Sequence, residues 1–289
     1  MPSLKSFTNS LPYFGRSRLL VNSAGDVVIV SAVRTALTKS KKGCFKDTNP
    51  EELLAVVLEE VVKRSKVNPA SIRDIAVGNV LPPGGVAKLA RMAQLFAGIP
   101  HTTPLNTVNR QCSTGLAAVV QIANEITAGT IDIGIGADFL QSTATGCLLP
   151  MGITSENVAK DYGITREEQD VFATKSYAKA VQAQKEGKFK SEIVPIRVKW
   201  KDPTTQQVKE IIVDADDGIR ECVTAESFSK LKPAFSKEGS SHAGNASQVS
   251  DGAAAVPLAR RSIAQKLGLP VLGKYVTSAV VGVPPRVMG

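Results

Sequence analysis

Two kinds of apolar pattern alternate along the first 150 residues of the chain. Continuous apolar runs of strand length occupy residues 26–33, 74–80 and 131–135. Apolar residues at helical spacing occupy residues 50–61, 88–97 and 113–128. Runs that are apolar on both faces are typical of strands in a covered parallel sheet. Strands that alternate with helices indicate right-handed crossovers, so this part of the chain is predicted to be an α/β domain with helices on both sides of a parallel sheet.

The pattern changes after residue 150, where charged residues become frequent. Amphipathic helices are predicted at residues 156–162 and 166–186, and alternating strands at 193–199 and 208–214 with a turn at Asp202-Pro203. This part reads as an α+β subdomain rich in loops. From Asp251 the sequence is again typical of buried segments, first as an apolar run and then as a helix that ends near Leu267. A last apolar run, after residue 270, is predicted to begin a strand.

Composition narrows the class of protein. The chain of 289 residues is 43% hydrophobic and 21% charged, as expected of a soluble globular protein. No apolar run is long enough to span a membrane. Cys44, Cys112, Cys147 and Cys222 are widely spaced and form no C-x-x-C pair, so neither a disulfide framework nor a zinc site is expected, and a reducing compartment is the default.

The net charge of +9 is concentrated at the two ends of the chain. Residues 1–25 contain Lys5, Arg16 and Arg18 and no acidic residue, whereas residues 151–245 contain equal numbers of acids and bases. A nucleic-acid-binding protein usually gathers its positive charge on one stripe. We therefore expect no nucleic-acid partner, and attraction to a small molecule that carries phosphate fits the charge equally well. Residues 1–25 are predicted to be a basic extension, either disordered or a targeting segment.

Cys112 is the candidate for chemistry that the residues themselves suggest. Leu116, Val119, Val120 and Ala123 recur at helical spacing, and Gly129 suits the position just after a helix. Cys112 thus precedes a helix start, where unpaired N–H groups and the helix dipole stabilise a thiolate and could also hold an oxyanion. On this evidence alone an inert, buried cysteine remains the alternative, because free cysteines are commonly buried.

Several segments in the same order resemble thiolases. N-R-Q-C-S-T-G-L-A-A at Asn109–Ala118 is similar to the nucleophile segment of that family. The other matching segments are V-R-T-A (33–36), G-N-V-L (78–81), P-M-G-I-T-S-E-N-V-A (150–159), L-K-P-A-F (231–235), A-G-N-A-S-Q-V-S-D-G-A-A-A (243–255) and V-G-V-P-P (281–285). The block at 150–159 and C-F-K-D-T at 44–48 look most like the peroxisomal 3-ketoacyl-CoA thiolases. The resemblance covers residues 26–289.

The resemblance implies a fold and a division of the chain. The fold would be the N-terminal half of a thiolase, a parallel-rich mixed sheet covered by helices, with an inserted α+β loop domain and without the second α/β half. The extension at 1–25 would be followed by the first part of the N-terminal domain at 26–147 and the loop and CoA-binding subdomain at 148–245. The last part of the N-terminal domain would occupy 246–270, and the start of a C-terminal domain 271–289.

The resemblance also implies a reaction and its residues. Cys112 would be the nucleophile that takes an acyl group from a 3-ketoacyl-CoA as a thioester, and free CoA, a co-substrate, would then accept that acyl group. Arg220 and Ser247 fall at positions that contact CoA, and a guanidinium suits phosphate recognition. Met151 and Phe235 fall where the acyl and pantetheine portions pass. No metal and no permanently bound cofactor are expected, and the full-length family forms homodimers.

The sequence departs from the family in two places. Family chains continue past V-G-V-P-P into a second α/β domain, but its N-E-A-F, G-H-P and C-x-G-x-G segments occur nowhere in this chain. After the strand at 131–136, A-D-F-L-Q-S-T-A-T-G-C-L-L replaces G-x-E-S-M-S and a longer stretch. The chain has two histidines, His101 and His242. We expect His101 to lie on the surface and His242 to be an exposed bystander in a loop.

Three functional hypotheses follow. The first is a thiolase-type acyltransferase of fatty-acid β-oxidation that acts through Cys112. The second is a catalytically incomplete isoform or pseudoenzyme that binds CoA or an intact thiolase subunit, and an exposed apolar face would then cause poor solubility or association with that subunit. The third is a cysteine-dependent thioesterase, which requires His242 beside Cys112. The family branch suggests the peroxisome, and a mitochondrial presequence at 1–25 is the alternative location.

Overall fold

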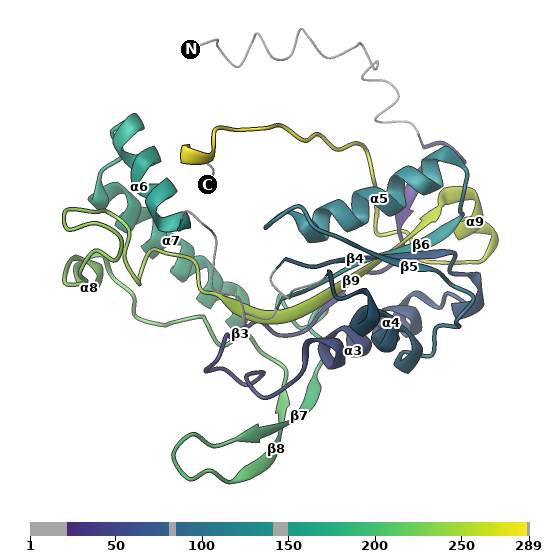
Figure 1. Cartoon of the computed structure of the whole chain (residues 1–289), viewed down its shortest axis with the longest axis horizontal. Helices are drawn as coiled ribbons and strands as arrows, with labels where there is room; N and C mark the ends of the chain where they lie inside the picture. Colours follow the sequence, from purple (N-terminus) through teal and green to yellow (C-terminus); the bar gives the residue numbers. More distant parts are fainter. Residues whose placement is uncertain (1–21, 81–84, 141–149, 288–289) are drawn as a thin grey trace, which may run out of the picture.

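A twisted sheet forms the centre of the molecule, with helices on both faces (Figure 1). The computed structural model describes residues 22–80, 85–140 and 150–287. The strands of the main sheet lie in the order β10-β1-β9-β6-β4-β5, and β2 and β3 pair with β9. These strands are β1 (Val27–Ile29), β2 (Val33–Arg34), β3 (Thr38–Lys39), β4 (Asp74–Gly78), β5 (Leu105–Val108), β6 (Ile133–Leu140), β9 (Ser250–Arg260) and β10 (Gly273–Lys274).

The remaining elements are a separate hairpin and the helices. The hairpin consists of β7 (Ile196–Lys201) and β8 (Val208–Val213) and projects from the body of the molecule (Figure 1). The helices are α3 (Pro50–Ser65), α4 (Ala87–Phe96), α5 (Thr114–Ala128), α6 (Met151–Tyr162), α7 (Arg166–Lys185), α8 (Ala225–Ser229) and α9 (Arg261–Lys266), with 3-10 turns at Pro69–Ser71 and Pro285–Val287. No helix in the described part of the chain is both long and apolar enough to cross a membrane.

The sheet is mixed, as the family resemblance implied. β4 is parallel to β5 and to β6; the apolar pattern predicted β4, α4, α5 and β6 in this order but not β5. β9 is antiparallel to both β6 and β1. The purely parallel sheet expected from the alternation alone is therefore wrong beyond β6, because β9 begins beside the carboxyl end of β6, with Gly252 opposite Leu140, and runs back along it.

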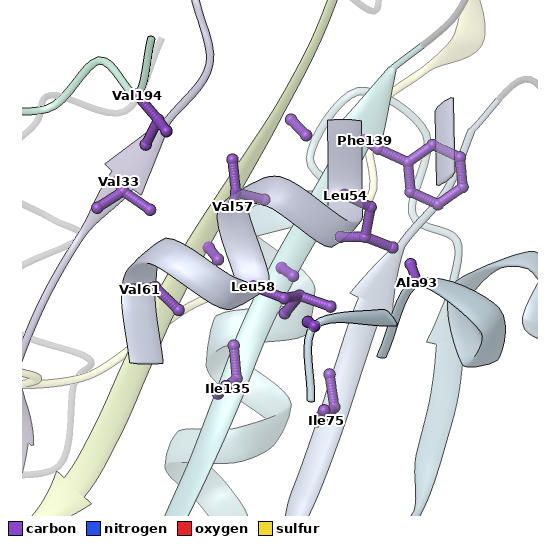
Figure 2. Close-up of a cluster of buried hydrophobic side chains, with 14 of the residues drawn as sticks. Val33, Leu54, Val57, Leu58, Val61, Ile75, Ala93, Ile135, Phe139 and Val194 are labelled. Atoms are coloured by element: carbon purple, nitrogen blue, oxygen red, sulfur yellow. The ribbon is translucent and has the colours of Figure 1, made fainter. Parts of the chain in front are cut away.

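Apolar side chains of α3 fill one face of the sheet. Leu54, Val57, Leu58 and Val61 are fully buried and pack over Ile75, Ile135 and Phe139 of the strands (Figure 2). Asn49 and Pro50 begin this helix with Glu51 and Glu52 in its first turn, as the sequence predicted. α4 lies beside α3 on the same face (Figure 1).

α5 covers the opposite face at very short range. Added to Gly136 of β6, a Cβ atom would lie 2.7 Å from the Cα of Val119. A Cβ atom added to Gly134 would lie 2.8 Å from Cγ2 of Ile122. The glycines of β6 therefore let the helix backbone approach the strand more closely than any side chain would allow. This contact fixes the height and the axial position of α5, and with them the segment that precedes its first turn.

Three predicted elements differ from the structure, and one strand of the structure was not predicted. The apolar run at 26–33 is divided into β1 and β2, both of which pair with β9. The strand that was not predicted is β5, because its sequence L-N-T-V lacks a continuous apolar run. α6 begins at Met151, five residues before the predicted start at Glu156. The apolar run after residue 270 forms only β10, and its valines, such as Val281 at 80% exposure, lie in an extended segment. Residues 1–21 and 141–149 lie outside the described residues.

Candidate active site

The segment that carries Cys112 joins the carboxyl end of β5 to the start of α5. Two hydrogen bonds of Asn109 shape this turn: its Oδ1 accepts from the backbone N–H of Gln111 at 2.9 Å, and its Nδ2 donates to the carbonyl of Val80 at 3.4 Å. Gln111 has a φ of 51°, in the left-handed region that non-glycine residues rarely adopt. The strained residue of this turn is therefore Gln111, directly before Cys112.

The start of α5 is built so that Cys112 stands in solvent. Ser113 is the N-cap residue, but its side chain donates to the carbonyl of Arg110 at 2.9 Å and does not cap the helix. Thr114 is buried and accepts a hydrogen bond from the backbone N–H of Arg110 at 3.0 Å. Cys112 itself is exposed, so it is not the buried cysteine of the alternative interpretation. The backbone N–H groups of Ser113 and Thr114 donate to the carbonyls of Arg110 and Gln111 at 3.2 and 3.1 Å, so the helix dipole, and not these two donors, favours negative charge at this helix start.

His242 is not the exposed loop residue that the sequence suggested. Its side chain is fully buried, and its Nε2 lies 2.7 Å from Oδ1 of Asp170 on α7. Its Nδ1 accepts a hydrogen bond from the N–H of Gly244 at 3.1 Å, so the proton of the neutral ring is on Nε2 and is donated to Asp170. Both ring nitrogens are engaged, and His242 is therefore not a base for Cys112. The thioesterase hypothesis loses the pair that it requires.

His101 lies at the other end of the sheet from Cys112. It is exposed and precedes β5, whereas Cys112 follows β5. A strand of this length separates its two ends by roughly 10 Å or more, which is too far for a hydrogen bond. Neither histidine of the chain can therefore take the proton of the Cys112 thiol.

The buried Asp170 organises the loop at 240–247. Its Oδ1 also accepts from Nδ2 of Asn245 at 3.1 Å, and its Oδ2 lies 3.5 Å from Nε of Arg166. Asn245 in turn accepts from the backbone N–H of His242 at 2.8 Å and donates to the carbonyl of Ser240 at 2.9 Å. No local signal in the sequence points to this network, because Asp170 is 72 positions from His242 in the chain.

Ser247 and Arg220 line two adjacent hollows. The first, of about 720 Å³, lies between α7 and the 244–247 loop and includes Phe172, Tyr177 and Ser247. The second, of about 490 Å³, includes Tyr177, Lys185 and Arg220. Because Tyr177 belongs to both, the two hollows adjoin. Lys185 is paired with Glu221 at 3.0 Å, whereas Arg220 is exposed and forms no ion pair within residues 22–80, 85–140 and 150–287.

Met151 and Phe235 lie together at the start of α6. A Cβ atom on Gly152 would fall 2.2 Å from the ring of Phe235, so this ring rests directly on the helix backbone next to Met151. Each of the two side chains is 38% exposed and neither is part of the buried core. Their surfaces are available to a ligand, as a role in lining an acyl or pantetheine path requires. Neither hollow is lined by Cys112, Met151 or Phe235.

Asp138 is a second residue that the sequence analysis did not single out. It follows the apolar part of β6, and burial raises the pKa of its carboxyl to about 6. Its position near the end of a parallel strand was a usable signal, because functional side chains gather at that edge of α/β sheets.

No group of three or more His, Cys, Asp or Glu side chains in the described residues is arranged to bind a metal ion.

Comparison with known proteins identifies the family. The family model described as "Thiolase, N-terminal domain" matches residues 27–138 and 137–262. The chain belongs to the thiolase family. The thiolase match is divided at residues 137–138, the point where the sequence departs from the family pattern after β6.

The thiolase relatives agree in sequence and in structure. The chain is 51% identical over 298 residues to the peroxisomal 3-ketoacyl-CoA thiolase of Yarrowia lipolytica, covering 96% of this chain and 72% of that protein. It is 50% identical over 286 residues to the human peroxisomal 3-ketoacyl-CoA thiolase, covering 92% and 67%. The crystal structure of the dimeric peroxisomal thiolase of Saccharomyces cerevisiae superposes with a TM-score of 0.85 at 44% identity, covering 94% of this chain and 74% of that one.

The chain is shorter than these thiolases. It spans between 62% and 72% of the length of the curated relatives named as peroxisomal thiolases of Yarrowia, Petunia, Arabidopsis and human. The alignment with the Petunia protein has 307 positions, at least 18 more than the 289 residues of the chain, so some of these positions are gaps in the chain. Another Saccharomyces thiolase structure is described as five layers constructed from two core domains of identical topology.

Proposed function

We propose that this protein transfers acyl groups by thiolase chemistry, cleaving a 3-ketoacyl-CoA with CoA to give acyl-CoA and acetyl-CoA. The Cys112 sulfur would attack the C3 carbonyl, the C2–C3 bond would break, and the acyl group would remain on sulfur as a thioester. The electron pair of the broken bond leaves with the acetyl-CoA enolate, which takes up a proton. The thiol of free CoA then attacks the thioester and restores the Cys112 thiol.

The exposed Cys112 at the start of α5 carries this proposal. It is the only cysteine within residues 22–80, 85–140 and 150–287 that stands directly before a helix of the main sheet layer, and it lies in the N-R-Q-C-S-T-G segment. The dipole of α5 at this end would favour a developing oxyanion. Arg220 and Ser247 would hold the phosphate and pantetheine parts of CoA in the two hollows beside α7, and Met151 and Phe235 would contact the acyl portion.

A second candidate function is favoured by the histidines. His242 is sealed against Asp170 and Gly244, and His101 lies at the far end of β5, so the base that deprotonates Cys112 must come from elsewhere. A chain without such a base would bind CoA, or join an intact thiolase subunit, without turnover. The names of the relatives favour the peroxisome as the location, and the dimeric Saccharomyces structure favours a homodimer.

Mass spectrometry of the acylated protein separates these two functions. We expect the chain, incubated with a long-chain 3-ketoacyl-CoA, to gain the mass of the acyl group on the peptide that contains Cys112. Added CoA should discharge this adduct and release acyl-CoA at a steady rate. Alkylation of Cys112 by iodoacetamide without any acyl adduct would favour the non-catalytic function, and absence of both would contradict the assignment of Cys112 as an accessible nucleophile.

Arg220→Ala should weaken the binding of CoA. The guanidinium has no competing ion pair in the described residues, so its loss removes a charge-assisted contact to phosphate of about 1–2 kcal/mol, or roughly five- to thirtyfold in Kd. Isothermal titration with CoA measures the change.

The matched ligand is pantetheine, which lacks the phosphates and should bind the variant and the wild type equally. The matched variant is Arg197→Ala, which removes an exposed cation from the distant hairpin. Equal losses for CoA and pantetheine would mean that Arg220 does not contact phosphate.

A further inference from the structure

We propose that Asp138 is a positioning residue of the acyl-accepting site, whose carboxylate beneath the first turn of α5 opposes negative charge on Cys112. This inference rests on the proposed role of Cys112 as the nucleophile. Asp138 would act through the helix start and would not touch the substrate. It lies in the A-D-F-L segment, where the sequence departs from the G-x-E-S-M-S pattern of the thiolases.

Two glycines make room for this carboxyl group. A Cβ atom on Gly78 of β4 would lie 2.7 Å from Oδ1 of Asp138, and a Cβ atom on Gly115 of α5 would lie 2.7 Å from Oδ2. The same Cβ atom on Gly78 would lie 2.9 Å from the methyl group of Thr114. Asp138 is therefore enclosed between the end of β4 and the first turn of the Cys112 helix, with no space for a larger neighbour.

The carboxyl group is only partly satisfied in this enclosure. The backbone N–H groups of Phe139 and Gly115 lower the pKa of this carboxyl, but its Oδ1 is buried and has no hydrogen-bond partner within residues 22–80, 85–140 and 150–287. Desolvation is the main reason that its pKa is raised to about 6, and the two hydrogen bonds lower the pKa by less. Near neutral pH the group is therefore largely ionised, without a compensating cation.

Among the residues that the structure describes, no charged neighbour shields Asp138 from Cys112. The residues that face it are Gly78 of β4, Thr114 and Gly115 of α5, and, across the antiparallel pair, Ala254 of β9. None of these is titratable. Asp251 of β9 lies on the opposite face of the sheet, because side chains alternate along a strand. Arg110 is exposed in the turn before the helix.

The position of Asp138 has a consequence for the nucleophile. Its carboxylate takes the N–H of Gly115, one of the free donors at the helix start, and adds a negative charge where the dipole would favour a thiolate. Protonation of Asp138 removes this opposition. The reactivity of Cys112 should therefore depend on the ionisation of a carboxyl group that lies on the far side of the helix turn.

The pH profile of Cys112 alkylation tests the proposal in the full chain. The rate with iodoacetamide, followed by mass spectrometry of the Cys112 peptide, is compared between the wild type and Asp138→Asn. Asparagine keeps the shape of the side chain and an acceptor for Gly115, but it carries no charge. Above about pH 7 the variant should react about fivefold faster, the scale of a Coulomb interaction between two partly solvated charges. Below about pH 5 the two rates should converge, because both side chains are then neutral.

Asp138→Asn is expected to fold. The folded-state pKa of Asp138 is raised, so the group contributes its stability below its unfolded-state pKa and loses it as the pH rises through about 6. The neutral variant avoids that loss, and its melting temperature at pH 8 should be at least that of the wild type. The matched control is Asp132→Asn, an exposed acid at the opposite end of α5 that pairs with Arg260.

Three outcomes would overturn the proposal. Parallel profiles for the wild type and Asp138→Asn would show that the charge does not reach Cys112. A rate difference of the same size at pH 5 and pH 8 would indicate a purely structural effect. Slower alkylation of the variant above pH 7 would show that the carboxylate assists the thiolate. Because the measurement needs no turnover, a chain without thiolase activity but with the predicted profile would contradict only the proposed function.

Discussion

Cys112→Ser should abolish acyl transfer. The thiol is exposed before an uncapped helix start, whereas a serine hydroxyl at the same place is far less acidic and has no histidine of this chain to activate it. We expect the acyl adduct to disappear and the rate of acyl-CoA release to fall by about 10³-fold or more. Intact-mass spectrometry detects the adduct, and a thiolysis assay with a long-chain 3-ketoacyl-CoA measures the rate.

Cys222→Ser is the matched control for this variant. Cys222 is also exposed, but it lies in the hollow lined by Arg220 and precedes no helix of the sheet layer. Its replacement should leave the acyl adduct in place. An adduct that survives in Cys112→Ser and is lost in Cys222→Ser would transfer the role of nucleophile to Cys222 and would contradict the site proposed here.

Asp170→Ala should cause the largest loss of stability among the polar side chains described. The replacement leaves the buried Nε2–H of His242 without an acceptor, removes one partner of Asn245, and leaves Arg166 without its carboxylate. An unsatisfied buried donor together with a broken, partly buried ion pair is expected to lower the free energy of unfolding by about 3 kcal/mol. Urea denaturation followed by circular dichroism measures this change.

The same substitution should also disturb the hollow lined by Tyr177 and Ser247, because hydrogen bonds among His242, Gly244 and Asn245 hold the loop that carries Ser247. Below the unfolding transition, the Asp170→Ala variant should therefore bind CoA more weakly while its Cys112 is alkylated at the wild-type rate. Asp161→Ala is the control, since Asp161 pairs with Arg286 on the surface and its loss should leave the midpoint unchanged. An equal effect of both substitutions would contradict the special role of the buried network.

Local sequence signals predicted most of the helices and the position of Cys112 directly before α5. Asn49-Pro50 marked the start of α3, and Gly129, with a φ of 81°, closes α5 where the sequence placed it. Cys112 was predictable because its position depends on the next few residues, whose apolar spacing defines the helix. These features need no knowledge of what packs against them.

Features that depend on distant partners were not predictable in the same way. β5 lacks an apolar run and becomes a strand through its pairing with β4. The sequence around His242 is typical of an exposed loop. In the structure His242 is buried, and its Nε2 binds Asp170 of α7, a residue far away in the chain. Asp138 gains its raised pKa from the enclosure formed by Gly78 and Gly115, which come together from two other elements. Strand pairing and side-chain burial between distant segments produce no periodic pattern in the sequence, so local patterns cannot predict them.

The close contact between α5 and the glycines of β6 also limits how the site can move. With backbone against backbone at Gly136 and Val119, the helix can neither slide along its axis nor roll without lifting off the sheet. Cys112 therefore directly precedes a helix whose position on the sheet is fixed. Any closing motion that shelters the acyl group from water has to come from the other side, from loops or subunits that approach a stationary sulfur atom.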